Sequence, residues 1–192
     1  MPELNNQNFN HLKIHTQYSI CEGAIKIDNL KDFCKEKKIP CLGISDTSNL
    51  CGALEFAENI SKVGTQPIIG TQIYFRFEDT TGLLPLIALN ENGYKRIIEL
   101  SSRSYLENDA LSDPHLDVKD LLIDTEGVSL LSGTIQGLFG KLFEKGRLDE
   151  ISKLYRSLSS KFNDNFYLEI QRHGDQNEIA FEKFNLEQSL KI

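Results

Sequence analysis

Short apolar runs and longer amphipathic stretches follow one another along this chain. The apolar runs are bounded by polar residues, which predicts short, largely buried strands. Six strands are expected, at residues 11–16, 41–46, 67–75, 83–89, 127–133 and 166–171. Apolar residues spaced three and four apart predict helices between most of them, as at Leu50, Ala53, Leu54 and Ala57. Residues 79–82 are expected to form a turn between the third and fourth strands.

Polar residues ahead of the amphipathic stretches predict where the helices begin. Asp28 is expected to cap the first helix, whose buried face would include Phe33. Asn90 is expected to cap the helix after the fourth strand, and Asp175 the last helix, which would run to Ile192. No strand is expected after that helix, so the sequence suggests a fragment of a longer protein.

The alternation of strands and helices predicts an α/β fold with a parallel sheet and right-handed crossovers. The sheet could be open or closed into a barrel. A typical (β/α) barrel needs about 200 residues or more and eight units, and this chain of 192 residues falls short of that. Neither a domain linker nor an internal repeat is apparent in the sequence.

Composition narrows the class of protein. The chain carries 28 acidic and 21 basic residues, a net charge of −7, without the basic stripe of a free-standing nucleic-acid binder. It has no apolar run of about 18 residues that would span a membrane, and no signal-peptide pattern at its start. Its four cysteines show no C-x-x-C pairing, which favours reduced thiols in the cytoplasm over a zinc site.

Candidate chemistry gathers where the first predicted strand ends. His11, Lys13 and His15 lie along this strand, and Glu22 follows in a polar loop closed by Gly23. In α/β folds the carboxyl ends of the strands are where sites are usually built. Asp46 stands at the end of the second strand. We expect it to fix the loop by accepting backbone amides, the alternative being a partner that orients a metal ligand.

Several motifs carry a resemblance to a known family. They are His11–Ser19, Glu22–Ala24, Gly43–Asn49, Gly52–Phe56, Pro67–Tyr74, Asn90–Tyr94 and Leu130–Gly133. In order and spacing they resemble the PHP (polymerase and histidinol phosphatase) domain at the N-terminus of bacterial DNA polymerase III alpha subunits. The resemblance covers nearly all of residues 1–192. It implies a distorted (β/α)₇ TIM-like barrel, here truncated at its C-terminal end, in a much longer polymerase.

Active PHP domains bind a cluster of metal ions at the strand ends, and this sequence departs from their ligand pattern. Carried over one position at a time, the first histidine of the H-x-H pair is Lys13 and the second is His15. The loop carboxylate is Glu22. The other vestigial positions are Thr47 after Asp46, Gln72 for a glutamate, Leu83 for a histidine, and Thr134 after Ser132-Gly133. The late D-x-H motif would lie beyond residue 192.

Lone pairs and charge weigh against a working metal site at these positions. A catalytic metal needs about three protein ligands, and only His15 and Glu22 remain good ones. Lys13 would place an ammonium, which has no lone pair, where a cation should sit. We therefore expect no metal, no other cofactor and no catalytic residue in this chain. Lys13 is expected to replace the lost metal by pairing with Glu22 or Asp46, unless its ammonium lies more than about 6 Å from every carboxylate.

The leading hypothesis is a non-catalytic PHP domain of the polymerase III alpha subunit. By resemblance it would brace the polymerase and dock the separate proofreading exonuclease subunit within the holoenzyme. The parent would synthesise DNA on a template with magnesium and would alone contact DNA. One alternative is a metal-dependent phosphoesterase or 3′–5′ exonuclease with a reduced site at His15 and Glu22. Another, an unrelated barrel enzyme, would need a convergent polar cluster that the sequence does not show.

Overall fold

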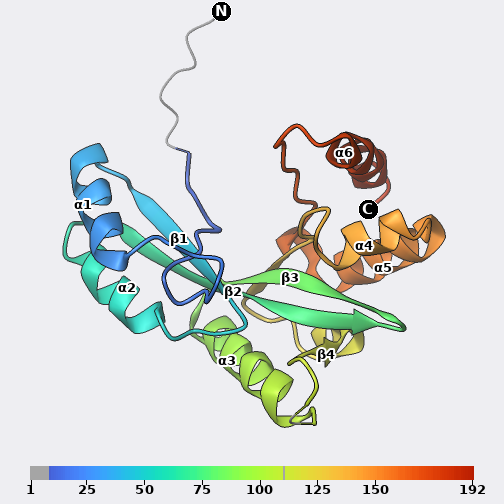
Figure 1. Ribbon diagram of the computed structural model, residues 1–192, viewed down its shortest axis with the longest axis horizontal. Coiled ribbons are helices and arrows are strands. Elements are labelled where there is room, and N and C mark those ends of the chain that lie inside the picture. Colours follow the sequence, from blue (N-terminus) through green and yellow to red (C-terminus); the bar gives the residue numbers. More distant parts are fainter. Residues whose placement is uncertain (1–8, 110) are drawn as a thin grey trace, which may run out of the picture. The chain divides into compact units, whose positions relative to one another are not determined.

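The chain is built from two compact units, described by a computed structural model for residues 9–109 and 111–192 (Figure 1). The first unit ends at Thr71 and the second spans Gln72–Ile192. The boundary falls inside one long strand, β2 (Gln66–Phe77), so each unit contains part of this strand. Both units combine helices with strands, which confirms the α/β class.

The first unit places two helices against a short sheet. Strand β1 (Cys41–Thr47) lies beside β2. Helices α1 (Ile27–Lys37) and α2 (Ala53–Ser61) pack together beside these strands (Figure 1). Their apolar faces meet in a core that excludes water, which supplies most of the driving force for this unit. The core residues are Ile27, Leu30, Cys34, Leu42, Ile44, Phe56 and Ile60.

The opening segment is extended but does not form the continuous strand that was expected. It joins β1 through a parallel bridge between Ile14 and Ile44, with the Ser45 amide donating to the Ile14 carbonyl over 2.8 Å. A second parallel bridge links Thr16 with Ile25. The chain turns at Thr16 because that residue's amide is hydrogen-bonded to a side chain instead of to a neighbouring strand. The expected strand is therefore corrected to two isolated bridges, at Ile14 and at Thr16.

Two helix starts in the first unit differ from the prediction. Lys26, not Asp28, is the N-cap of α1, and its side chain makes no capping bond. Phe33 is 41% exposed and so lies off the buried face. Helix α2 begins only at Ala53, because the Asn49 side chain first accepts the Cys51 amide and holds a turn there. Leu54 is 71% exposed and so lies off the buried face of α2, which consists of Ala53, Phe56 and Ile60.

The sheet of the second unit is mixed, which corrects the expected all-parallel sheet. Strand β3 (Thr80–Ala88) follows β2 after the two-residue turn 78–79, and β5 (Val128–Leu131) runs antiparallel to β3. Strand β6 (Phe166–Tyr167) lies parallel to β5, and β4 (Leu116–Asp117) pairs parallel with β2. The physical reason is the turn between β2 and β3, since a two-residue connection can join only antiparallel strands.

Strand β6 is also shorter than expected. The prediction ran from 166 to 171, but the ladder stops after Tyr167, whose carbonyl accepts the Ser132 amide over 2.9 Å. The next amide in register, that of Glu169, donates to the Ser132 hydroxyl over 2.8 Å. A side chain thus takes the place of the strand partner and ends the pairing.

The helices of the second unit begin largely where their caps predict. They are α3 (Glu91–Leu106), α4 (Leu138–Glu144), α5 (Leu148–Phe162) and α6 (Gln176–Ser189), with 3₁₀ turns η1 (Val118–Leu122) and η2 (Asn163–Asn165). The Asn90 side chain accepts the Gly93 amide over 2.9 Å and the Asp175 side chain accepts the Asn177 amide over 2.7 Å, confirming both caps. Helix α6 ends at Ser189 instead of Ile192.

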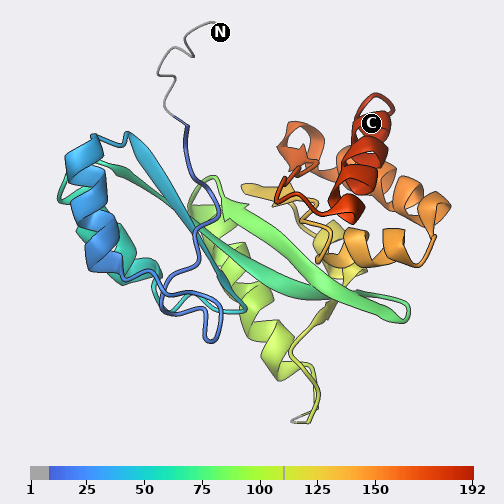
Figure 2. The ribbon, with the colours of Figure 1, turned by 45° about the horizontal axis from the view of Figure 1, so that its top comes forward.

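Helices α4, α5 and α6 lie together in the second unit (Figure 2). The Phe139 and Tyr155 rings meet edge to face at 4.6 Å between α4 and α5, and Phe143 contacts Phe181 of α6 at 5.3 Å. Burial of these rings fixes the helices against one another. Of the described helices, none combines the length and the apolar character that a membrane span requires.

An ionic cluster ties the β2–β3 turn to the start of α5. The Arg147 guanidinium bonds to Glu78, Asp79 and Glu150, and it also lies 5.4 Å from the centre of the Phe77 ring. The bond from Arg147 holds the pKa of the Glu150 carboxyl below its usual range. The pKa of Asp79 is also lowered, first by the Thr80 hydroxyl and then by the Lys145 ammonium.

Acid is expected to weaken the second unit through this cluster. A carboxyl group whose pKa is lower in the folded state stabilises the fold above its unfolded pKa, and this stabilisation disappears as protons bind. The melting temperature should therefore fall as the pH drops below about 5, and it should fall less steeply in Arg147→Met. Thermal unfolding followed by circular dichroism at several pH values measures both slopes. Equal slopes in the two proteins would contradict the assignment to this cluster.

Candidate functional site

The eight positions singled out from the sequence are divided between the two units. The first unit contains five of them, and the second contains three. The first set is Lys13, His15, Glu22, Asp46 and Thr47, and the second is Gln72, Leu83 and Thr134.

Asp46 is the centre of the best-defined polar cluster in the first unit. Asp46 is 1% exposed, and it is the last residue but one of β1. Its carboxylate accepts the Thr16 amide over 2.6 Å, the Thr16 hydroxyl over 2.8 Å and the Ser19 hydroxyl over 2.6 Å. Asp46 was expected to fix the loop by accepting backbone amides. It accepts one amide, and the other two donors are hydroxyl groups.

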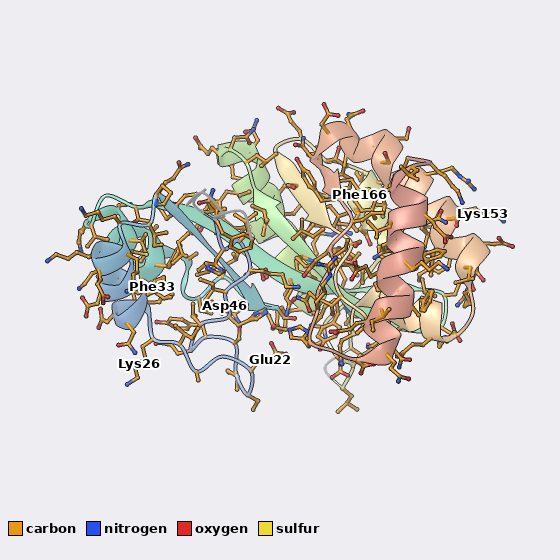
Figure 3. The ribbon with its side chains drawn as sticks, turned by 90° about the horizontal axis from the view of Figure 1, so that it is seen from above. Glu22, Lys26, Phe33, Asp46, Lys153 and Phe166 are labelled. Atoms are coloured by element: carbon orange, nitrogen blue, oxygen red, sulfur yellow. The ribbon has the colours of Figure 1, made fainter. Side chains whose placement is uncertain are left out.

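Glu22 and Thr47 are brought together at the edge of this cluster. The Thr47 hydroxyl donates to the Glu22 carboxylate, which lies on the exposed side of the loop. Figure 3 labels both carboxylates, with Asp46 inside the first unit and Glu22 at its surface. Thr47, at the position for which the resemblance implied a histidine, therefore supplies a hydroxyl that binds Glu22.

His15 and Lys13 are both half-buried in the segment that leads into the loop. His15 Nδ1 is buried, and within the described residues it meets no hydrogen-bond partner. The pairing of Lys13 with Glu22 or Asp46 stays a prediction.

The three positions of the second unit lie on strands and on one turn. Gln72 is 7% exposed on β2, and Leu83 is half-buried on β3. Thr134 opens a turn in which its hydroxyl accepts the Gln136 amide over 3.1 Å and its carbonyl accepts the Gly137 amide over 2.9 Å. This turn lies close to β3, because a Cβ added to Gly137 would stand 2.8 Å from the Leu83 carbonyl oxygen. Leu83 and Thr134 are therefore brought near each other.

Sequence reasoning missed two residues of the polar cluster, Thr16 and Ser19. Both lie in the loop directly after the opening segment, and both present hydroxyls to Asp46. Serine and threonine side chains often bond to nearby polar groups in turns. Two hydroxyl residues three positions apart, near the end of the expected strand, could therefore have indicated a hydrogen-bonded turn. Nothing in the sequence showed that Asp46 would be their acceptor.

Among the residues that the structure describes, no group of three or more histidine, cysteine, aspartate or glutamate side chains is placed to hold a metal ion.

Comparison with protein families identifies the chain. The model of the PHP domain matches residues 11–173. The chain belongs to the PHP domain family. The motifs that carried the resemblance all lie within this range, so the match confirms the expectation drawn from them.

Curated relatives of this PHP domain are DNA polymerase III alpha subunits. The DNA polymerase III subunit alpha of Caulobacter vibrioides is 37% identical over 191 residues, which cover 95% of this chain and 17% of that protein. The Rickettsia felis subunit is 35% identical, covering 86% of this chain and 14% of that protein. The chain thus spans about a sixth of the length of these relatives.

A solved structure shares the fold of this PHP domain. It is a Bifidobacterium adolescentis protein described as a metal-dependent phosphoesterase, with a TM-score of 0.56 and 12% identity. The similarity covers 94% of this chain and 84% of that one. At this level of identity the likeness concerns the fold alone.

Proposed function

We propose that this chain is a non-catalytic PHP domain of a replicative DNA polymerase alpha subunit. The similarity to DNA polymerase III alpha subunits along 86–95% of the chain supports this context. In this proposal residues 1–192 form a truncated (β/α)₇ TIM-like barrel within a longer polymerase. The parent would carry out template-directed synthesis with magnesium bound in a different domain, and only the parent would contact DNA.

One observation carries the non-catalytic part of the proposal. Both retained carboxylates are engaged by protein donors, Asp46 by Thr16 and Ser19, and Glu22 by the Thr47 hydroxyl. A metal ion at these oxygens would have to displace the bonds. The family's metal cluster therefore does not fit the donor set of the first unit, and we derive no step through a metal.

The proposed role is structural support and protein binding. A PHP domain without turnover can brace the polymerase and dock the proofreading exonuclease subunit. The net charge of −7 suits a protein partner better than direct contact with DNA. In this proposal the chain's own residues maintain a folded surface and perform no bond cleavage.

A second function is favoured by one specific observation at His15. Its buried Nδ1 atom has no hydrogen-bond partner within the described residues, as a nitrogen that normally binds a ligand would. A reduced site of His15 and Glu22 would make the chain a metal-dependent phosphoesterase or 3′–5′ exonuclease. His15 and Glu22 would hold the metal, which would supply activation of water for the hydrolysis of a phosphate ester.

Metal content and hydrolysis separate these two functions. We expect the purified chain to bind less than about 0.1 equivalent of zinc, manganese or iron, because fewer than about three ligands are available. We also expect no Mn²⁺-dependent shortening of a 5′-labelled single-stranded oligonucleotide above the rate of a His15→Ala variant. About one metal per chain, with hydrolysis that His15→Ala abolishes, would establish the enzyme instead.

Docking is tested on its own. The chain should co-elute with the proofreading exonuclease subunit of the same organism in size-exclusion chromatography, and an unrelated exonuclease of similar size serves as the control. The docking role would be contradicted if neither the chain nor the full-length polymerase that contains it co-eluted with the exonuclease subunit.

A further inference from the structure

The loop Thr16–Gly23 is tied to the end of β1 through one buried carboxylate. Asp46 receives three hydrogen bonds from Thr16 and Ser19, all between 2.6 and 2.8 Å. A buried carboxylate is costly unless its oxygens are satisfied, and it has about four acceptor sites. Three donors from one loop therefore meet most of the need of Asp46 for hydrogen bonds.

A second tie runs through Ser19 and Thr47. The Ser19 hydroxyl donates to Asp46 and accepts the Thr47 amide over 3.1 Å. The Thr47 hydroxyl in turn donates to Glu22, three residues further along the loop. The two residues at the end of β1 thus hold the loop at its beginning, its middle and near its end.

Side chains from the turn before α2, from α2 itself and from β2 add further hydrogen bonds to the loop and to Asp46. The Asn49 side chain donates to the Tyr18 carbonyl and to the Thr47 carbonyl, both over 2.9 Å. The Tyr18 hydroxyl donates to Glu55 of α2 over 2.6 Å. The Thr71 hydroxyl donates to the Asp46 carbonyl over 2.6 Å, which fixes the backbone of the residue that binds the loop.

We infer that this network of hydroxyl and carboxylate groups replaces metal ions as the structural centre of the loop. In metal-binding members of the family the loop carboxylate is a metal ligand, whereas here Glu22 binds the Thr47 hydroxyl. The order of residues 16–23 is consequently independent of divalent cations and depends on the hydroxyls of Ser19 and Thr47. The inference concerns the site of the proposed function but does not depend on exonuclease docking.

Hydrogen exchange of the loop amides measures this order directly. The amides of Ser19, Glu22 and Gly23 are bonded within the loop, to the carbonyls of Thr16 and Ser19, so they report on its opening. In Thr47→Val we expect exchange in a peptide covering residues 17–23 to become about tenfold faster, which corresponds to about 1.4 kcal/mol for one bond to a charged group. Ser19→Ala is expected to have at least the same effect.

A matched variant controls for general destabilisation. Thr65→Val likewise removes one threonine hydroxyl, which donates to the Ile39 carbonyl in the same unit. Its loop exchange should stay within about twofold of the parent, because Thr65 makes no bond to the loop. Adding EDTA, Mn²⁺ or Zn²⁺ to the unmodified chain should leave the loop exchange unchanged.

Three results would overturn the inference. They are faster loop exchange after EDTA treatment, slower loop exchange with Mn²⁺ or Zn²⁺, and an unchanged rate in Thr47→Val. The outcome is separable from that of the proposed function. Metal-dependent hydrolysis with metal-independent loop exchange would contradict the non-catalytic proposal alone, while a metal-ordered loop without hydrolysis would contradict this inference alone.

Discussion

Replacing Asp46 with alanine is expected to destabilise the chain by about 3 kcal/mol, because it leaves one amide and two hydroxyls without their charged acceptor. The side chain is 1% exposed, so water cannot readily take its place. The affected donors are those of Thr16 and Ser19. Urea unfolding followed by far-ultraviolet circular dichroism measures the loss in the free energy of unfolding.

Asp28→Ala is the matched control for Asp46→Ala. Asp28 belongs to the same unit but has a side chain that is 76% exposed, with a weak contact to Lys31 at 3.9 Å. Exposed ion pairs of this kind contribute little, so the change should cost less than about 1 kcal/mol. Similar losses in the two variants would mean that the hydrogen bonds of Asp46 do not hold the loop.

Gly23→Ala should be about as damaging, by about 3 kcal/mol, for a purely steric reason. A Cβ at this position would overlap the carbonyl oxygen of Thr16, and its distance to the carbonyl carbon would be 2.7 Å. Both atoms belong to the backbone, so a side-chain rotation cannot relieve the overlap. The loop would have to open at the point where the Gln17 amide donates to the Ile25 carbonyl over 2.9 Å. The same urea titration measures the loss.

Gly64→Ala separates this overlap from the general cost of replacing glycine. Gly64 has a φ of +81°, but an added Cβ would meet no atom within 4 Å. A side chain there costs about 1 kcal/mol for the backbone conformation. If Gly23→Ala cost no more than Gly64→Ala, the close approach of residues 16 and 23 would be contradicted.

The order of the elements could be predicted largely because local patterns determine it. The apolar run before Asp46 is a strand and Asn90 is a helix cap in the structure, since burial and capping act over a few residues. The direction of the strands is different. The antiparallel pairing of β3 with β5 joins residues about forty positions apart, and no local pattern encodes which strands become neighbours.

The site shows the same difference: the sequence indicates which residues belong to it, but not which residues bond to one another. The sequence predicted that Glu22, Asp46 and Thr47 belong to one vestigial site, and the resemblance to the PHP family implied their positions. It could not show that the Thr47 hydroxyl binds Glu22 or that Ser19 bridges Asp46 and the Thr47 amide. These bonds depend on how closely the loop approaches the end of β1.

The sequence by itself determined the family and the α/β class, and it predicted the loss of metal ligands, because these follow from residue identity and from periodicity along the chain. Only the tertiary structure decided what the retained carboxylates do. A carboxylate can bind a metal, a cation or a hydroxyl, and the choice depends on which donors the fold brings within about 3 Å. For Asp46 those donors are Thr16 and Ser19, which lie 30 and 27 positions away in the sequence.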